Sequence, residues 1–185
     1  RKHNSNGSSP VDTLISERHT LLIDSQQIFK GGTMREESLD TTTITQVAIV
    51  VHDIEAKVKA WADVLGVPVP EIMTTAPLEQ SQLHYQGEPS EARAKLAFIS
   101  LGQVTLELIE PIGGPSTWRD ALEQHGESLH HIAFNIKGMK EKIAYLGAKG
   151  VPLVQTGEYT GGRYAYADGV PKLGAVLELL ENDLQ

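Results

Sequence analysis

The sequence predicts an α+β fold in which two tandem βαβββ modules form a curved, cup-shaped mixed sheet with helices outside. Three observations predict it: two segments recur in the same order, each half changes from strand to helix periodicity, and each half ends in a predicted hairpin. A chain of 185 residues is long enough for two such modules that share one core.

The first repeat opens each module. It aligns the segment that begins at Ile44, ITQVAIVVHDIEAKVKAWADVLGVPV, with the segment that begins at Leu129, LHHIAFNIKGMKEKIAYLGAKGVPLV. The alignment pairs Gln46 with His131, and both copies end in Gly-Val-Pro plus an aliphatic residue. In each copy an alternating apolar stretch precedes residues with helical spacing, so each module is predicted to begin with a strand and a helix.

Residues at the ends of the two helices support this assignment. The first copy turns at Asp53, which is well placed to cap the first helix, and the second copy turns at Gly138. Gly66 and Gly150 suit the left-handed conformation that ends a helix. Both helices are therefore predicted to be short and to end at a glycine.

The second repeat closes each module. LELIE, from Leu106, matches LELLE, from Leu177, and the preceding segments, KLAFISLGQ and RYAYADGVPKLGA, each predict an apolar strand and a turn. Between the modules, PIGGPSTWRDALEQHGES predicts a turn and a short helix. The polar stretch from Thr74 to Ala94 has little pattern, and we expect a third strand plus a loop over the cleft there.

These assignments set the boundaries. The first module is predicted at 41–115, a linking helix at 116–126 and the second module at 127–185. Residues 1–40 lack sustained periodicity, so we expect a leader or flexible arm without a targeting function. Because the first methionine is Met34, we interpret the residues before it as a leader added for expression.

Composition excludes several classes of function. The net charge of −8, from 16 basic and 24 acidic residues, disfavours a nucleic-acid partner, which requires a basic surface. No apolar run is long enough for a membrane span, and we expect a cytoplasmic protein. The chain has no cysteine, so any metal ion must bind nitrogen and oxygen ligands.

Four polar side chains are predicted to share one face of the sheet. Strand alternation directs Glu107 and Glu178 away from their flanking leucines. Gln46 and His131 begin the two modules, so all four occupy matching positions of the repeat. We predict that these four side chains bind one divalent metal ion. His130, next to His131, is expected to point to the opposite face and either to have a structural role or to support a metal ligand without binding the metal itself.

The ligand types limit the metal and its chemistry. One imidazole with oxygen ligands suits Zn, Co, Ni or Mn. Such an ion would polarise a carbonyl group, and Glu107 and Glu178 are the predicted catalytic residues that move a proton at the adjacent carbon. Epimerisation and isomerisation follow from that arrangement. The glycine pairs at 113–114 and 161–162 indicate turns rather than phosphate-binding loops, so no organic cofactor is expected.

Several segments resemble the vicinal oxygen chelate superfamily, which contains glyoxalase I, methylmalonyl-CoA epimerase, extradiol dioxygenases and bleomycin-resistance proteins. The resemblance covers Ile44 to Glu181 and is strongest for the epimerase-like branch, through QVAIVVHDIE, LELIEP, GESLHHIAFNI and LGAVLELLE. It implies the glyoxalase-like fold and metal ligands at the four positions named above. It also implies that Glu178 is the usual candidate base and that Glu107 is its partner.

Two of the four positions depart from the usual epimerase pattern, which has histidine at the position of Gln46 and glutamine at that of Glu107. The set Gln-Glu-His-Glu is instead similar to that of the eukaryotic type of glyoxalase I. The resemblance therefore implies an epimerase or isomerase acting on a methylmalonyl-CoA-like acyl thioester, with lactoylglutathione lyase activity as the alternative. Extradiol dioxygenase chemistry is disfavoured. The iron site of those enzymes has two histidines and one carboxylate, whereas one of the histidine positions is Gln46 in this chain.

A metal-free protein that only sequesters a small molecule, as the bleomycin-resistance type does, is the alternative from another class. The expected partner in every case is a small molecule, and an acyl-CoA or a glutathione adduct fits the enzymatic alternatives. Four basic residues are candidates for binding the phosphates of CoA, although solvated surface charge is the other interpretation of each: Arg93, Lys95, Arg163 and Lys172. The resemblance implies that a homodimer can form, but one chain already carries both modules, so a complete site does not require a second chain and the oligomeric state stays open.

Overall fold

The structure, a computed structural model, describes residues 38–183. The arm predicted at 1–40 lies outside the described residues except for its last three. The strands and helices in chain order are β1 (Gln46–Val50), α1 (Ile54–Leu65), β2 (Met73–Thr74), α2 (Leu78–Ser81), β3 (His84–Tyr85), β4 (Glu88–Pro89), β5 (Arg93–Leu101), β6 (Val104–Ile112), α3 (Thr117–His125), β7 (Ser128–Asn135), α4 (Met139–Ala148), β8 (Leu153–Tyr159), β9 (Gly162–Ala167), α5 (Val170–Leu173) and β10 (Val176–Asn182).

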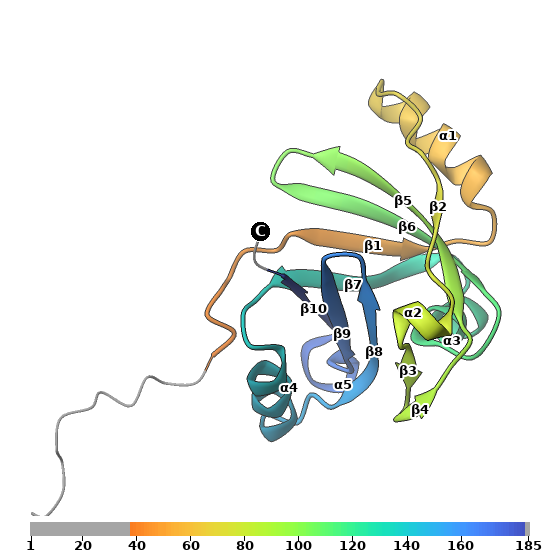
Figure 1. The fold of residues 1–185 in the computed structure, drawn as a ribbon. Helices are drawn as coiled ribbons and strands as arrows, with labels where there is room; N and C mark the ends of the chain where they lie inside the picture. Colours follow the sequence, from red (N-terminus) through yellow and green to blue (C-terminus); the bar gives the residue numbers. More distant parts are fainter. Residues whose placement is uncertain (1–37, 184–185) are drawn as a thin grey trace, which may run out of the picture. The chain divides into compact units, whose positions relative to one another are not determined.

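In the described part of the chain the strands form one mixed sheet that curls into a half-barrel (Figure 1). Its order is β2-β5-β6-β1-β7-β10-β9-β8-β3-β4. The antiparallel pair β1 and β7 lies in the middle, with β6 parallel to β1 and β10 parallel to β7. Outward from this pair, β1-β6-β5-β2 repeats as β7-β10-β9-β8, so the halves are related by an approximate twofold axis. The predicted α+β fold class is confirmed.

Helix α1 covers the outer face of the first half. Asp53 caps it as predicted, since its carboxylate accepts a hydrogen bond from the amide of Ala56 at 3.0 Å. The helix ends at Gly66 in the left-handed conformation, with φ of 66°. Its buried residues Ile54 and Val58 pack against apolar side chains of β5 and β6. Burial of this apolar stripe, which the helical spacing predicted, holds α1 on the sheet.

Helix α4 covers the outer face of the second half, but its first turn is capped from another element. Gly138 precedes the helix and has no side chain to cap it. The carboxylate of Glu181, on β10, instead accepts hydrogen bonds from the amides of Gly138 and Met139 at 2.5 and 3.3 Å. Met139 and Leu146 pack against β9 and β10. The closing strand therefore fixes both the sheet and the start of α4.

The inner face has a separate apolar cluster at one end. Trp118 of α3 and Leu83 pack there with Ala48, Val50 and Ile109, which project inward from β1 and β6. All five side chains are at least 97% buried. Unlike α1 and α4, α3 therefore packs on the inner face, and it closes the sheet beside the predicted site.

The connection from β2 to β5 differs from the prediction of one strand and a loop. Residues 75–92, named the bridging segment below, contain α2, β3 and β4. Strand β3 pairs antiparallel with β8, the outer strand of the second half. Tyr85 donates a hydrogen bond to Asp120 of α3, which anchors the segment. In the second half the equivalent strands, β8 and β9, are joined by a turn at Thr160 and Gly161. Sequence periodicity is local and did not predict this long-range pairing.

The last residues of the predicted arm lie against the second half. The ammonium group of Lys142, on α4, donates to the carbonyl oxygen of Ser38 and to the carboxylate of Asp40, each at 2.6 Å. Leu39 packs with the apolar cluster beneath α4. Among the helices of residues 38–183, none has both the length and the apolar character needed to cross a bilayer.

Candidate metal centre

The four predicted ligands come from the four central strands of the sheet: Gln46 from β1, Glu107 from β6, His131 from β7 and Glu178 from β10. Ala48 lies opposite Glu107 on one side and opposite His131 on the other. Ala133 lies between Gln46 and Glu178 in the equivalent way. Directly opposite residues project from the same face. The duplicated register therefore places all four side chains on the inner face.

Small residues leave room between these side chains. Ala48 and Ala133 are fully buried, and each presents only a methyl group between two of the predicted ligands. A larger residue at either position would occupy the space in which the polar groups meet. Ala48 and Ala133 occupy equivalent positions of the repeat, as Gln46 and His131 do, so both halves provide this space in the same way.

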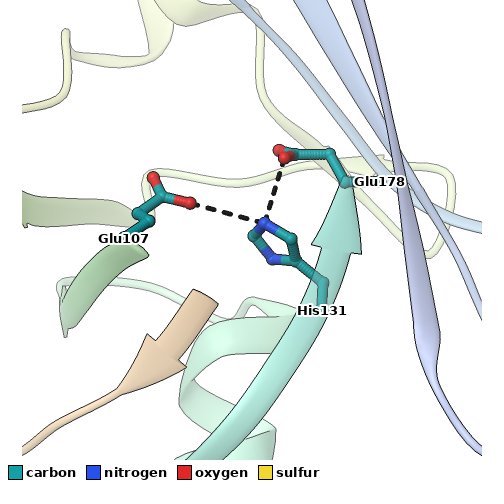
Figure 2. A group of neighbouring side chains, drawn as sticks. All are labelled: Glu107, His131 and Glu178. Carbon is teal, nitrogen blue, oxygen red and sulfur yellow. Dashed lines mark ion pairs between the residues drawn. The ribbon is translucent and has the colours of Figure 1, made fainter. Parts of the chain in front are cut away.

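The carboxylates of two of these residues, Glu107 and Glu178, converge on the Nε2 atom of His131. This atom lies 3.4 Å from Oε2 of Glu107 and 3.0 Å from Oε2 of Glu178 (Figure 2). One ligand atom from each residue fits within 4.8 Å of the others. The amide nitrogen of Gln46 donates to Oε2 of Glu107 at 3.3 Å, which joins Gln46 to the group. The structure thus brings all four predicted residues together, and their roles as ligands stay a prediction.

The group is buried, and this changes its electrostatics. His131 is fully buried, and Glu107 and Glu178 are 5% and 4% exposed. Burial raises the pKa of Glu107 and Glu178 raises it further, although His131 acts in the opposite direction. Burial alone would lower the pKa of His131, but the two carboxylates outweigh it and raise that pKa to about 10. Without a metal ion, the imidazole is therefore the cation that balances the carboxylates.

The unpaired atoms of the group fit a divalent cation. Within residues 38–183, Nε2 of His131 and Oε2 of Glu178 are buried and have no hydrogen-bond partner, although they lie 3.0 Å apart. Buried polar atoms without partners are rare, and two buried carboxylates need a positive charge. One imidazole with oxygen ligands is a donor set that Zn, Co, Ni or Mn accepts. The residues present therefore fit such an ion.

The expectation that His130 points to the opposite face is wrong. Ala48 pairs with His131 and the next residue, Ile49, pairs with Leu129, so a β-bulge leaves His130 without a partner on β1. The Nδ1 atoms of His130 and His131 lie 2.9 Å apart. Burial and the adjacent His131 lower the pKa of His130 to about 3, so the His130 ring is neutral at physiological pH. Strict alternation does not predict a bulge.

Tyr166 of β9 belongs to the same cluster, although the sequence analysis did not select it. Its ring centre lies 4.9 Å from that of His131 and 5.2 Å from that of His130. The indole nitrogen of Trp118 donates to its hydroxyl oxygen at 3.1 Å. Tyr166 lies opposite Glu178 in the β9–β10 hairpin. The alternation of RYAYA across this hairpin was the signal that could have identified it.

The basic residues considered for binding CoA each have a local partner. Lys95 pairs with Glu110 at 2.8 Å, and Arg163 pairs with Glu181 and Asp183. Arg93 donates to the carbonyl of Thr75 at 2.8 Å, and Lys172 donates to the carbonyl of Lys149. Each of the four basic side chains is therefore held by a neighbouring group of the protein itself.

Comparison with known proteins agrees with the observed fold. A family model described as the glyoxalase/bleomycin resistance protein/dioxygenase superfamily matches residues 45–166, which include β1 through β9 up to Tyr166. The chain belongs to this superfamily. The matched range contains three of the four predicted ligands, and Glu178 follows on the next strand.

Relatives within the superfamily include methylmalonyl-CoA epimerases. The chain is 26% identical over 126 residues to the mitochondrial methylmalonyl-CoA epimerase of Mus musculus, which is 60% of this chain and 63% of that protein. It is 37% identical over 70 residues to the uncharacterized protein YqjC of Bacillus subtilis (strain 168), which is 38% of this chain and 50% of that protein. In both cases the chain spans less than two thirds of the relative.

A solved methylmalonyl-CoA epimerase, in complex with methylmalonyl-CoA and NH4+, has a similar fold. The TM-score is 0.53 with 25% sequence identity, and the similarity covers 78% of this chain and 96% of the other.

Proposed function

We propose that this chain is a metal-dependent enzyme that removes a proton from the carbon next to a carbonyl group, and that it acts as an epimerase or isomerase on a methylmalonyl-CoA-like acyl thioester. The observation that carries the proposal is the buried convergence of Glu107, His131 and Glu178, with Gln46 beside them. The likeness to methylmalonyl-CoA epimerases supports the choice of substrate.

In this proposal Gln46, Glu107, His131 and Glu178 would hold one divalent ion. Such an ion would supply Lewis-acid polarisation of the substrate carbonyl, which would make the neighbouring C–H bond more acidic. The surrounding burial strengthens these electrostatic interactions by excluding water.

The two carboxylates are proposed to carry the proton. Glu107 and Glu178 come from strands on opposite sides of the central β1–β7 pair, and they approach His131 from different directions (Figure 2). One group, as the carboxylate, takes the proton from one face of the substrate carbon, and the other, which starts as the protonated acid, gives its proton to the opposite face, so that the two carboxyl groups exchange protonation states. This exchange inverts the carbon and leaves no net change in protons.

The second candidate activity is that of a lactoylglutathione lyase. The amide nitrogen of Gln46 lies 3.3 Å from Oε2 of Glu107, beside the group of Glu107, His131 and Glu178, and this supports a Gln-Glu-His-Glu set. That set is similar to the eukaryotic type of glyoxalase I. The hemithioacetal formed from methylglyoxal and glutathione needs a proton moved between adjacent carbons, so the same two carboxylates would serve.

Metal analysis of the purified protein and two activity assays test the proposal. We expect about one equivalent of a divalent metal, and turnover of either methylmalonyl-CoA or the glutathione hemithioacetal identifies the branch. The variant Glu178→Gln is expected to lose epimerisation, while Glu158→Gln, a glutamate exposed on β8, keeps it. Stoichiometric binding of a small molecule, without metal or turnover, would contradict the enzyme and support sequestration.

A further inference from the structure

The two adjacent histidines on β7 lie side by side because of the bulge. β1 pairs with His131 through Ala48 and with Leu129 through Ile49, and His130 is the extra residue between them. A bulge re-aims side chains that would otherwise alternate. His130 and His131 are both buried, at 5% and 0% exposure, and both rings pack on Tyr166. The bulge therefore brings a second imidazole to the inner face next to the proposed ligand.

We propose that His130 is a positioning residue that fixes the orientation and the tautomer of His131 through a hydrogen bond between their Nδ1 atoms. The inference rests on the proposed function, because it assigns His130 to the metal site proposed above. The Nδ1 atoms lie 2.9 Å apart, and the ring planes are inclined by 79°. That distance is typical of a hydrogen bond, and one of the two nitrogens must carry the hydrogen.

The direction of this hydrogen bond follows from the other nitrogen of His131. Nε2 faces the carboxylates of Glu107 and Glu178 at 3.4 and 3.0 Å, so it is the atom that would bind a metal ion and must then lack a proton. The proton of His131 consequently lies on Nδ1 and is donated to Nδ1 of His130. His130 in turn carries its own proton on Nε2.

The choice of a neutral acceptor has a physical reason. Histidines that bind metals usually donate their second N–H to a carboxylate or to a backbone carbonyl. Here two carboxylates already lie beside His131, and a third would add buried negative charge. An imidazole accepts the hydrogen bond without adding charge. Tyr166 packs on both rings and is held by Trp118, so the rings have little freedom to rotate.

Two substitutions of His130 separate positioning from simple packing. His130→Leu fills a similar volume but accepts no hydrogen bond, whereas His130→Asn offers its side-chain oxygen near the place of Nδ1. We expect His130→Leu to weaken Co²⁺ binding about 10–100-fold and to change the visible absorption of the bound Co²⁺. We expect His130→Asn to restore most of the affinity and the spectrum. Binding and a spectrum equal to wild type in folded His130→Leu would overturn the inference.

A measurement on the metal-free wild-type protein removes any dependence on how the variants fold. Nitrogen-15 NMR of the imidazoles is expected to find the proton on Nδ1 of His131, none on Nδ1 of His130, and a scalar coupling between the two nitrogens. A proton on Nδ1 of His130 would overturn the inference. Absence of Co²⁺ binding together with the expected coupling would instead reject the proposed metal-dependent function, and leave the hydrogen bond established.

Discussion

The two halves of the sheet have the same register but different side chains at the site. Gln46 and Ala48 of the first half correspond to His131 and Ala133 of the second, and both halves place a glutamate opposite the alanine. Yet Gln46 is only half-buried, and its side chain donates a hydrogen bond to Glu107. His131 is fully buried against Tyr166.

The outer strands also differ. The first half extends its bridging segment to pair with β8, whereas the second half joins its equivalent strands by a two-residue turn from Thr160 to Gly161. The two halves therefore share a duplicated backbone but contribute unequally to the predicted site. The second half supplies the fully buried predicted ligand His131, and the first half supplies the more exposed predicted ligand Gln46 at the equivalent position. We expect metal affinity to depend more on the second half, while proton transfer depends on both.

The largest expected effect tests whether both halves take part in catalysis. Glu107→Gln and Glu178→Gln are each expected to lower epimerisation roughly 10²–10⁴-fold, because each removes one proton carrier. Each variant should still exchange the substrate proton with D₂O from one stereoisomer only, and the two variants should prefer opposite stereoisomers. NMR detection of deuterium incorporation measures this. If both variants exchange the same stereoisomer, the two halves do not have complementary roles.

The second prediction compares the two non-acidic ligands. His131→Ala is expected to lower Co²⁺ or Zn²⁺ affinity by more than 100-fold, and Gln46→Ala by about tenfold, in titration calorimetry. His131→Ala should also destabilise the metal-free protein by about 3–5 kcal/mol, because it leaves two buried carboxylates without a cation. His125→Ala, an exposed histidine at the end of α3, is the control. Equal losses in Gln46→Ala and His131→Ala would contradict the proposed asymmetry.

The third prediction concerns the space between the ligands. Ala48→Val and Ala133→Val are each expected to destabilise the protein by about 1–3 kcal/mol, since both methyl groups are fully buried. Both should also weaken metal binding, because the added carbons lie between the predicted ligands. Chemical denaturation and metal titration measure the two effects. Normal metal affinity in either variant would show that the alanine does not border the site.

The smallest expected effect is a pH dependence of metal affinity, which arises from His131 in the second half alone. In the metal-free protein the pKa of His131 is raised from 6.5 to about 10, so His131 is protonated at pH 7.5. Metal binding must then release about one proton, and affinity should rise with pH up to about 10. The amide of Gln46 does not titrate. Calorimetry in buffers with different ionisation enthalpies counts the proton, and no release would contradict this assignment.

The same pKa shift predicts the stability of the metal-free protein. A raised pKa in the folded state contributes stability that is fully present below pH 6.5, the ordinary pKa, and is lost as pH rises toward 10. Unfolding measured between pH 6.5 and 10 should therefore show decreasing stability without metal. Added metal should reduce this decrease, because it replaces the proton as the counter-charge of the carboxylates.

Much of the fold was predictable because its signals are local. Helix α1 follows directly from Asp53, the apolar stripe through Ile54 and Val58, and Gly66. The repeat aligned Gln46 with His131, and the leucines around Glu107 and Glu178 indicated which way those carboxylates point. Period-two alternation in regular strands is sufficient for that inference.

The bridging segment was not predictable in the same way. His84 and Tyr85 pair with Thr156 and Gln155, far along the chain, and neither segment has a pattern that indicates a partner. Pairing of this kind depends on which edge of the finished sheet is available.

The sequence by itself determined the duplicated α+β fold and the four matching positions that face inward, because the repeat and the strand alternation are properties of neighbouring residues. Only the tertiary structure decided that His130 joins His131, that Tyr166 packs on both, and that their surroundings exclude water. Those features depend on a bulge against β1 and on contacts between distant strands, where burial and pairing geometry rather than local pattern set the position of each side chain.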